Sequence, residues 1–125
     1  MINQKKIILV VDDEIELTEV IIEIFSERGY ECISAQGGDE AFQILKERNG
    51  NIDIILSDIK MPNGDGIELL KNIKNSKFNT NVYLMTGQSE HDEAQLKKEG
   101  ATEVFYKPMS FEIVFAEFEK KLNQP

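Results

Sequence analysis

The stretch IILVVDD, residues 7–13, decides the fold of this chain. Its five apolar residues in a row are too few for a typical helix and leave no polar face. Such runs are typical of strands that are covered on both sides in a parallel sheet. Two aspartates follow at once. The stretch therefore predicts a buried parallel strand that delivers acidic side chains to one edge of a sheet.

Similar apolar runs recur along the chain, separated by patterns with the period of a helix. The runs occupy residues 52–56, 82–85 and 104–106, and a weaker one occupies residues 31–35. Between them, apolar residues return at the i, i+3, i+4, i+7 spacing of an amphipathic helix. One stripe consists of Leu17, Val20, Ile21, Ile24 and Phe25, and another of Phe111, Val114, Phe115, Phe118 and Leu122. Helix C-terminal caps are expected at Gly29, Gly50 and Gly100.

This alternation predicts an α/β fold in which five strands alternate with five helices. The expected architecture is a doubly wound, flavodoxin-like parallel sheet with the strand order 2-1-3-4-5. A chain of 125 residues is about one domain long, so residues 1–125 are expected to form a single domain. In such sheets, ligands bind beyond the carboxyl ends of the strands, where the strand order reverses. The site is therefore expected between the ends of the first and third strands.

The composition excludes several classes of protein. The net charge is −9, and an acidic surface repels the phosphate backbone, so direct nucleic-acid binding is not expected. No apolar run is long enough to cross a bilayer, and Met1–Lys6 lack the apolar segment of a signal peptide. The single cysteine, Cys32, rules out an internal disulfide framework. We expect a cytoplasmic protein without membrane insertion.

Four of the expected strands finish on polar side chains. The first is followed by Asp12-Asp13, the third ends in Ser57-Asp58, the fourth in Thr86-Gly87 and the fifth in Lys107-Pro108. Taken singly, each has an ordinary explanation, because aspartate and threonine are common helix N-caps and lysine is common in solvated turns. These explanations do not account for three aspartates and a lysine that the fold brings to one edge.

The chemistry of this set is specific. Crowded carboxylates repel each other and need a cation, and oxygen ligands with open coordination positions suit Mg²⁺, or Mn²⁺ in its place. A carboxylate beside such an ion can attack phosphorus and form an acyl phosphate, whose oxygens a lysine and a hydroxyl stabilise. We therefore predict Asp58 as the phosphoacceptor, Asp12 and Asp13 as metal ligands, and Thr86 and Lys107 as phosphoryl-binding residues.

These motifs, in this order, resemble the receiver domain of two-component response regulators, over essentially the whole chain. The matching segments are Val10-Val11-Asp12-Asp13-Glu14, Asp58-Ile59-Lys60-Met61-Pro62 with Gly66, Met85-Thr86-Gly87, Gly100-Ala101 and Lys107-Pro108. The resemblance implies a phosphoacceptor in two-component or phosphorelay signalling. It implies a signalling domain that assists its own phosphorylation and dephosphorylation, not an enzyme acting on other substrates.

The resemblance also implies a ligand set and partners. Mg²⁺ would be bound by Asp13, by Asp58 and by the backbone carbonyl of Lys60, with Asp12 acting mainly through metal-bound water. The phosphoryl donor would be a phosphohistidine on a sensor histidine kinase or a histidine phosphotransfer protein. The signal would pass by protein–protein contacts to an unknown downstream target, and the family also allows a homodimer that forms on phosphorylation.

The sequence departs from the family pattern at the residue that usually reads the site. The family has tyrosine or phenylalanine three residues before the strand-end lysine, and this ring changes rotamer together with the strand-end threonine. Here that position is Val104, which we interpret as ordinary strand packing. Phe105 and Tyr106 follow, but we expect them to point elsewhere. The usual switch is therefore not expected to operate in its usual form.

Two further positions are expected to tune the site. In the family, the residues corresponding to Lys60 and Gln88 look out over the phosphoryl group and affect how water reaches it. A lysine at position 60 would pair with the phosphoryl group and obstruct in-line attack, which gives a long-lived aspartyl phosphate. The alternative is a solvated lysine on a loop. Together with Val104, this lysine resembles sporulation-type phosphorelay intermediates more than motor-binding regulators.

One surface is a candidate docking site. Ile15 and Ile22 lie one heptad apart on the first expected helix, off its core stripe, and are predicted to form an exposed apolar patch for the helical bundle of a phosphodonor. Burial of Ile15 by the neighbouring loop is the competing account.

Alternatives from other classes also remain open. A haloacid dehalogenase-type phosphatase would need Asp-x-Asp after the first strand, and a flavodoxin-like cofactor binder would need a phosphate loop rich in Ser, Thr and Gly there. The chain has adjacent acids instead. A complete single-domain regulator and a fragment of a longer one are both consistent with the sequence.

Overall fold

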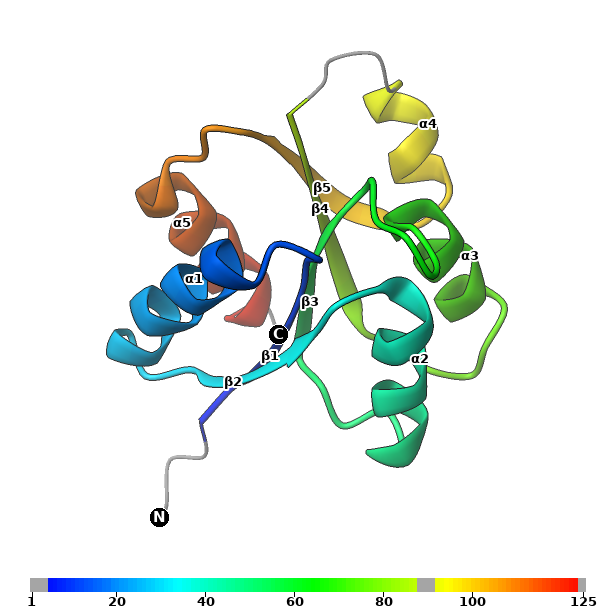
Figure 1. Cartoon of the computed structure of the whole chain (residues 1–125), viewed down its shortest axis with the longest axis horizontal. Coiled ribbons are helices and arrows are strands. Elements are labelled where there is room, and N and C mark those ends of the chain that lie inside the picture. The colour runs from blue at the N-terminus through cyan, green and yellow to red at the C-terminus, as the bar shows by residue number, and fades with distance from the viewer. Residues whose placement is uncertain (1–4, 88–91, 124–125) are drawn as a thin grey trace.

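A parallel five-stranded sheet forms the centre of the molecule (Figure 1). The computed structural model describes residues 5–87 and 92–123. The strands are β1 (Ile7–Val11), β2 (Glu31–Ala35), β3 (Ile54–Asp58), β4 (Asn81–Thr86) and β5 (Ala101–Tyr106). They lie in the order β2-β1-β3-β4-β5, and every neighbouring pair is parallel. The predicted fold class and strand order are confirmed, and the order reverses between β1 and β3.

Helices cover both faces of the sheet. They are α1 (Ile15–Glu27), α2 (Gly38–Glu47), α3 (Gly66–Lys74), α4 (Glu93–Lys98) and α5 (Phe111–Leu122). Figure 1 shows α1 and α5 on one side of the sheet and α2, α3 and α4 on the other. Since each of the four connections between successive strands crosses over through a helix, the carboxyl ends of the strands point to one edge, as ligand-binding doubly wound folds require.

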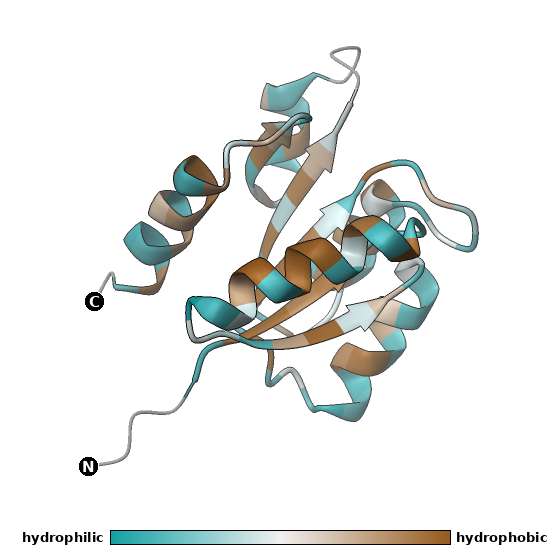
Figure 2. Ribbon diagram, turned by 60° about the vertical axis from the view of Figure 1, so that its left-hand side comes forward, coloured by the Kyte–Doolittle hydropathy of each residue, from teal (hydrophilic) through white to brown (hydrophobic). Residues whose placement is uncertain are grey.

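The two faces of the sheet carry separate hydrophobic cores because successive strand residues point in opposite directions. In β1, Ile8 and Val10 pack under α1 and α5, while Leu9 and Val11 pack under α2 and α3, and all four are fully buried. The α1–α5 side is rich in aromatic rings, with Phe25 in edge contact with Phe115 at 5.0 Å between centroids. In Figure 2 the central strands are accordingly mostly brown. Continuous burial explains why the strands read as unbroken apolar runs.

The core face of α1 differs from the predicted stripe. The buried residues of this helix are Thr18, Ile21 and Phe25, whereas Val20 is 50% exposed. The hydroxyl of Thr18 donates to the carbonyl of Glu14 at 3.0 Å, so this polar side chain is satisfied where it faces the sheet. Leu17 and Ile24 of the predicted stripe pack against the core together with Ile21 and Phe25, so Val20 is the one stripe residue that faces solvent. Ile22, predicted as exposed, instead packs half-buried against the core.

Other boundaries shift by a few residues. The apolar run at residues 52–56 predicts a strand, but β3 starts at Ile54 and extends to Asp58, with Ile52 buried ahead of it. The helix ends follow the prediction, because Gly29 and Gly100, which come directly after the C-caps of α1 and α4, have φ values of 91° and 117°. Over the described part of the chain, no helix is both long and apolar enough to cross a membrane.

Candidate functional site

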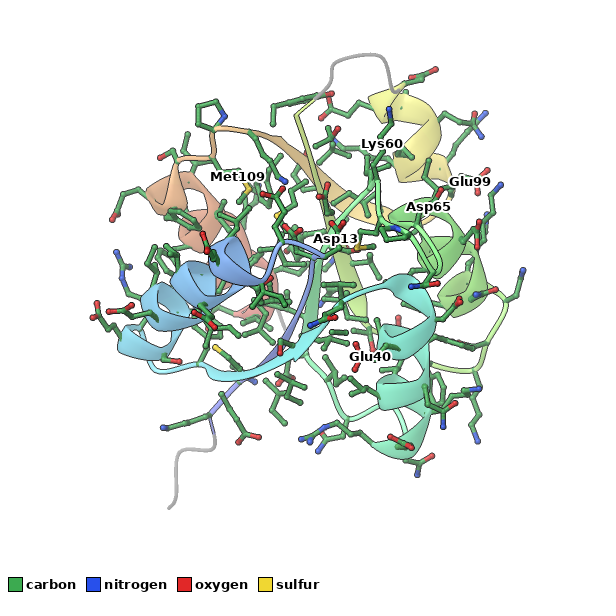
Figure 3. The ribbon with its side chains drawn as sticks, viewed as in Figure 1. Asp13, Glu40, Lys60, Asp65, Glu99 and Met109 are labelled. Carbon is green, nitrogen blue, oxygen red and sulfur yellow. The ribbon has the colours of Figure 1, made fainter. Side chains whose placement is uncertain are left out.

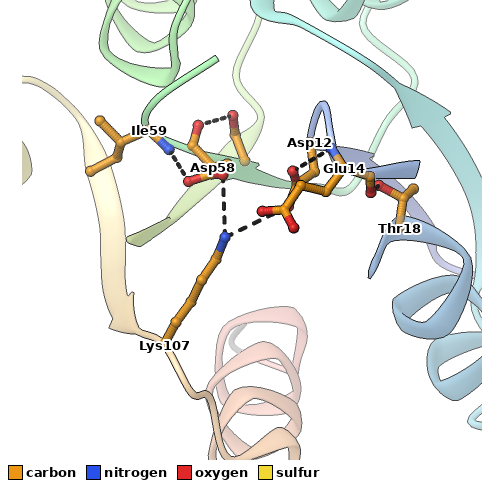
Figure 4. A network of polar contacts seen from close by, with 7 residues as sticks. Asp12, Glu14, Thr18, Asp58, Ile59 and Lys107 are labelled. Carbon is orange, nitrogen blue, oxygen red and sulfur yellow. Dashed lines mark hydrogen bonds and ion pairs between the residues drawn. The ribbon is translucent and has the colours of Figure 1, made fainter. Parts of the chain in front are cut away.

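Polar side chains meet at the carboxyl edge of the sheet, where the strand order reverses. Val11 at the end of β1 pairs with Ser57 in β3, so Asp12 and Asp58 leave neighbouring strands side by side. Thr86 ends β4, and Lys107 directly follows β5. Figure 4 shows Lys107 reaching between Asp58 and Asp12. The structure therefore gathers at one edge the strand-end residues that the sequence predicted.

Asp58 is held in place from three directions. Its carboxylate oxygen Oδ1 accepts a hydrogen bond from the N–H of Ile59 at 2.8 Å, and Oδ2 accepts one from Lys107 Nζ at 3.2 Å. The Ser57 hydroxyl donates to the Asp58 carbonyl at 2.8 Å. Gly66 makes this arrangement possible, since a Cβ at that position would clash with the same carbonyl oxygen. Asp58 is 8% exposed, which leaves the carboxylate accessible from one side.

Asp12 is almost completely buried. Its oxygen Oδ1 accepts a hydrogen bond from the N–H of Glu14 at 2.9 Å. Among the described residues, Oδ2 has no hydrogen-bond partner, and it lies 3.8 Å from Lys107 Nζ, within ion-pair range but beyond hydrogen-bond range. Burial raises the pKa of this carboxyl, and the negative charge of Asp58 raises it further, although the Glu14 N–H and Lys107 oppose the rise. A buried carboxylate oxygen without a hydrogen bond needs a further partner, and a cation can serve as one.

The acidic group of the site includes one residue that the sequence reasoning did not assign. Carboxylate oxygens of Asp12, Glu14 and Asp58 all lie within 4.8 Å of one another. Asp13, predicted as a metal ligand, is exposed and is not a member of this group. Figure 3 shows Asp13 close to the end of β1. The signal in the sequence that could have assigned Glu14 was its place directly after the acid pair. In the structure Glu14 is the N-cap residue of α1, and within the described part of the chain its side chain makes no capping hydrogen bond.

Thr86 and Lys107 are joined through the backbone. The N–H of Lys107 donates to the carbonyl of Thr86 at 2.8 Å, which extends the β4–β5 pairing past Tyr106. Thr86 is 4% exposed. The structure therefore holds the predicted hydroxyl and ammonium groups on two adjacent strand ends, on the side of Asp58 opposite β1.

The loop between β3 and α3 presents Lys60 to solvent. Its neighbours Ile59 and Met61 are both buried, so the backbone of Lys60 is anchored on each side while its side chain is exposed. In Figure 3, Lys60 stands above the carboxyl edge, on the same loop as Asp65. Gln88, the other predicted tuning residue, lies outside the described residues.

The departure from the family pattern on β5 has a structural consequence. Val104 is 5% exposed and packs in the core under α3 and α4, as expected of ordinary strand packing. Phe105 points into the opposite core. Tyr106 was predicted to point elsewhere, but it lies two residues after Val104 and so shares its face of the sheet. Its hydroxyl lies 3.5 Å from an oxygen of Glu93 in the first turn of α4.

Fold and site together define a class of protein. This is a doubly wound α/β domain whose carboxylates and lysine converge at the switch point of the sheet, the arrangement of a phosphorylatable signalling domain.

Comparison with known proteins gives the family. The model of the response regulator receiver domain matches residues 8–119. The chain is 40% identical over 114 residues to Sporulation initiation phosphotransferase F of Bacillus subtilis, covering 90% of this chain and 88% of that protein. It is 36% identical to the Transcriptional regulatory protein ZraR of Klebsiella oxytoca, covering 84% of this chain but only 24% of that longer protein.

Solved structures agree. A chain of the CheX-CheY-BeF3-Mg complex from Borrelia burgdorferi superposes with a TM-score of 0.88 and 28% identity, covering 95% of this chain and 90% of its own. The response regulator TrrA of Thermotoga maritima, solved with Mg²⁺ and BeF, gives a TM-score of 0.80 and 33% identity, covering 92% and 97%. The chain belongs to the response regulator receiver domain family. It is thus a signalling domain of the two-component type, and neither the phosphatase nor the flavodoxin-like alternative is supported.

Proposed function

We propose that this chain accepts a phosphoryl group on Asp58 from a phosphohistidine and signals through protein–protein contacts, with residues 1–125 acting as one receiver domain. The observation that carries the proposal is the setting of Asp58. One of its oxygens lies 3.2 Å from the ammonium group of Lys107, and its carboxylate also belongs to the acidic group with Asp12 and Glu14. A nucleophile between a fixed positive charge and a potential cation site is suited to attack on phosphorus.

The residues present fit a divalent cation. Among the described residues, Asp12 Oδ2 is buried without a hydrogen bond. The carboxylates of Asp12, Glu14 and Asp58 lie so close together that they repel one another unless a cation neutralises them. Hard oxygen donors of this kind suit Mg²⁺ or Mn²⁺. We propose that Asp12, Asp13, Asp58 and the carbonyl of Lys60 hold it, with Glu14 beside Asp12 and Asp58. The cation, when bound, neutralises charge on the transferring phosphoryl oxygens.

The transfer step uses the chain's own groups as follows. A carboxylate oxygen of Asp58 attacks phosphorus, and the new P–O bond forms as the donor's P–N bond breaks. The electron pair of the P–N bond stays on the imidazole nitrogen of the donor. Lys107 moves its contact from the carboxylate to a phosphoryl oxygen, and the Thr86 hydroxyl donates to another. Because Lys107 already lies on Asp58, little rearrangement of charge is needed.

The chain also assists the reverse chemistry in this proposal. Water attacks the phosphorus of the aspartyl phosphate, the P–O bond to Asp58 breaks, and the carboxylate is restored with release of phosphate. Lys60 is exposed on the loop that follows Asp58, in a position to contact the phosphoryl group and hinder the approach of water. We assign the same tuning role to Gln88, and we propose that the aspartyl phosphate is long-lived.

The partner surface that we propose is α1, beside the site. Its exposed apolar residues are Ile15, at 55% exposure, and Val20, at 50%. Val20 thus takes the place predicted for Ile22. Exposed apolar side chains next to a phosphoacceptor suit the helices of a sensor histidine kinase or a phosphotransfer protein. In the same proposal the chain works in the cytoplasm, passes the signal to a protein target, and forms a homodimer when phosphorylated.

Incubation with acetyl phosphate and Mg²⁺, followed by intact-protein mass spectrometry, tests the function. The wild type should gain the mass of one phosphoryl group, and Asp58→Asn should gain none. Chelation of the cation by EDTA should prevent labelling. Absence of labelling in the wild type, or equal labelling of the Asp58→Asn variant, would contradict the proposal.

A further inference from the structure

The first turn of α2 is capped by another loop rather than by its own side chain. The N-cap residue is Gly37, which has no side chain to accept a hydrogen bond. The first N–H groups of any helix lack partners within the helix. Here the N–H of Gly38 donates to the carbonyl of Gly64 at 2.7 Å, and that of Asp39 donates to the carbonyl of Asn63 at 3.2 Å. The acceptors belong to the loop between β3 and α3.

The two backbones approach so closely that only glycine fits. A Cβ at Gly38 would lie 2.8 Å from the Gly64 carbonyl oxygen, and one at Gly37 would lie 2.8 Å from that of Asn63. A Cβ at Gly64, where φ is +92°, would lie 2.6 Å from a carboxylate oxygen of Asp39. We call this contact, formed by Gly37, Gly38 and Asp39 with Asn63 and Gly64, the glycine interlock.

The loop held by the glycine interlock is the one that carries the site. It begins at Asp58, passes through Lys60 and ends at Asp65, which caps α3 by accepting from the N–H of Glu68 at 2.8 Å. Side chains of Ile59 and Met61 fix its first half in the core. The glycine interlock fixes its second half against α2. Figure 3 shows this arrangement, with Lys60 and Asp65 on the loop and Glu40 on the adjacent α2.

We propose that Gly38 and Gly64 are positioning residues, which hold the loop in the conformation that presents the Lys60 carbonyl to the cation. The inference rests on the proposed cation site. It extends that proposal, because it attributes the position of the Lys60 carbonyl to contacts with α2, a helix to which none of the proposed ligands belongs. Linkage then requires the reverse effect. If forming the glycine interlock raises the affinity for the cation by some factor, cation binding must raise the equilibrium constant for forming the glycine interlock by the same factor.

Gly38→Ala tests the first half of the proposal. The new Cβ must displace the loop carbonyl, yet alanine is a better helix former than glycine, so α2 itself is not weakened. Mn²⁺ affinity, measured by the EPR signal of the free ion, should fall by about fivefold or more. The matched control Gln43→Ala, on an exposed position of the same helix, should bind as the wild type does. Wild-type affinity in Gly38→Ala would overturn the proposal.

Amide hydrogen exchange in the wild-type protein tests the second half without any substitution. Saturating Mg²⁺ should slow exchange at the amides of Gly38 and Asp39 by about the same factor of five. The amide of Ala41, which donates within the helix start to Gly37, should respond less. Equal exchange rates with and without Mg²⁺ at the amides of Gly38 and Asp39 would overturn the proposed coupling between the glycine interlock and the cation.

The two proposals fail in distinguishable ways. If the wild type binds Mn²⁺ through Asp12 and Asp58 but neither test gives the expected result, the cation site is retained and the positioning role of the glycine interlock is wrong. If Asp12→Asn and Asp58→Asn bind Mn²⁺ as tightly as the wild type, the cation site itself is wrong, and the interlock proposal falls with it.

Discussion

The ammonium group of Lys107 lies 3.2 Å from Asp58 and 3.8 Å from Asp12, so one positive charge serves two carboxylates on neighbouring strands. The lysine directly follows β5, and its backbone N–H is tied to Thr86 at the end of β4. Its position is therefore fixed by the sheet at one end and by electrostatic attraction at the other. Lys107 occupies the space that separates the phosphoacceptor from the buried acid.

Replacing this lysine should affect cation binding and phosphorylation in opposite directions. In Lys107→Gln the site loses a positive charge that competes with a cation, so Mn²⁺ should bind about fivefold more tightly. Labelling by acetyl phosphate should nevertheless be slower by about tenfold, because the same charge stabilises the transferring phosphoryl group. Metal titration and time-resolved mass spectrometry measure the two effects. Lys120→Gln, on the exposed side of α5, is the control, and equal changes in both variants would contradict the assignment.

Asp12 should reduce the stability of the metal-free protein. Its side chain is fully buried and one oxygen makes no hydrogen bond, so its charge is only partly offset by Lys107. Asp12→Asn removes the charge and should raise the free energy of unfolding by about 1 kcal/mol at neutral pH without metal. Thermal melts in EDTA measure the gain. With excess Mg²⁺ the order should reverse, since the wild type, with its full set of carboxylates, gains more binding energy from the ion than the variant does.

The pH dependence of this difference has a definite sign. The pKa of Asp12 is raised by burial, so the native state binds its proton more tightly than the unfolded chain does. The loss of stability that the charged Asp12 carboxylate causes is complete above its native pKa. This loss decreases as the pH falls through the native pKa toward the ordinary 3.8. The advantage of Asp12→Asn should therefore shrink in acid. An advantage that grows as the pH is lowered would show that Asp12 is stabilised as a carboxylate.

The sheet could be predicted because its central strands, β1, β3 and β4, are buried on both faces and so appear in the sequence as apolar runs. The predicted bounds of β1 and β2 are those of the structure. The face of α1 could not be predicted equally well. Thr18 counts as polar in a hydropathy pattern, but its hydroxyl is satisfied by the Glu14 carbonyl within the helix start. A hydropathy pattern does not record a hydrogen bond of this kind, so Thr18 was left out of the predicted core face and Val20 was placed in it.

The site shows the same division. Asp12, Asp58, Thr86 and Lys107 were predicted from their places at strand ends, which the topology brings together. Glu14 was not assigned, since whether an acid that begins a helix turns toward the site depends on its rotamer. The glycine interlock was also missed. It joins Gly38 to Gly64 across a separation in sequence that no local pattern encodes, and each glycine alone reads as an ordinary turn or helix end.

If the phosphodonor protein docks on α1, substitutions on α1 should slow transfer from that protein but not from acetyl phosphate. The variant Ile15→Ala, Val20→Ala removes exposed side chains and should fold with unchanged stability. It should accept phosphoryl from acetyl phosphate at the wild-type rate but from its phosphodonor protein about tenfold more slowly. The control is Ile113→Ala, which removes an apolar side chain that is 60% exposed on α5. An unchanged rate with the protein donor would rule out this surface.

Lys60 should lengthen the life of the aspartyl phosphate. Its backbone is fixed by the buried side chains of Ile59 and Met61, so the exposed side chain starts from a fixed point two residues after Asp58, above the carboxyl edge in Figure 3. A positive charge there pairs with phosphoryl oxygens and blocks the line along which water must attack. In Lys60→Asn the phosphoryl group should be lost about tenfold faster, as followed by mass spectrometry after removal of acetyl phosphate. Lys71→Asn, on the exposed face of α3, should decay as the wild type does, and a Lys60→Asn variant no faster than this control would show that the lysine is only a solvated loop residue.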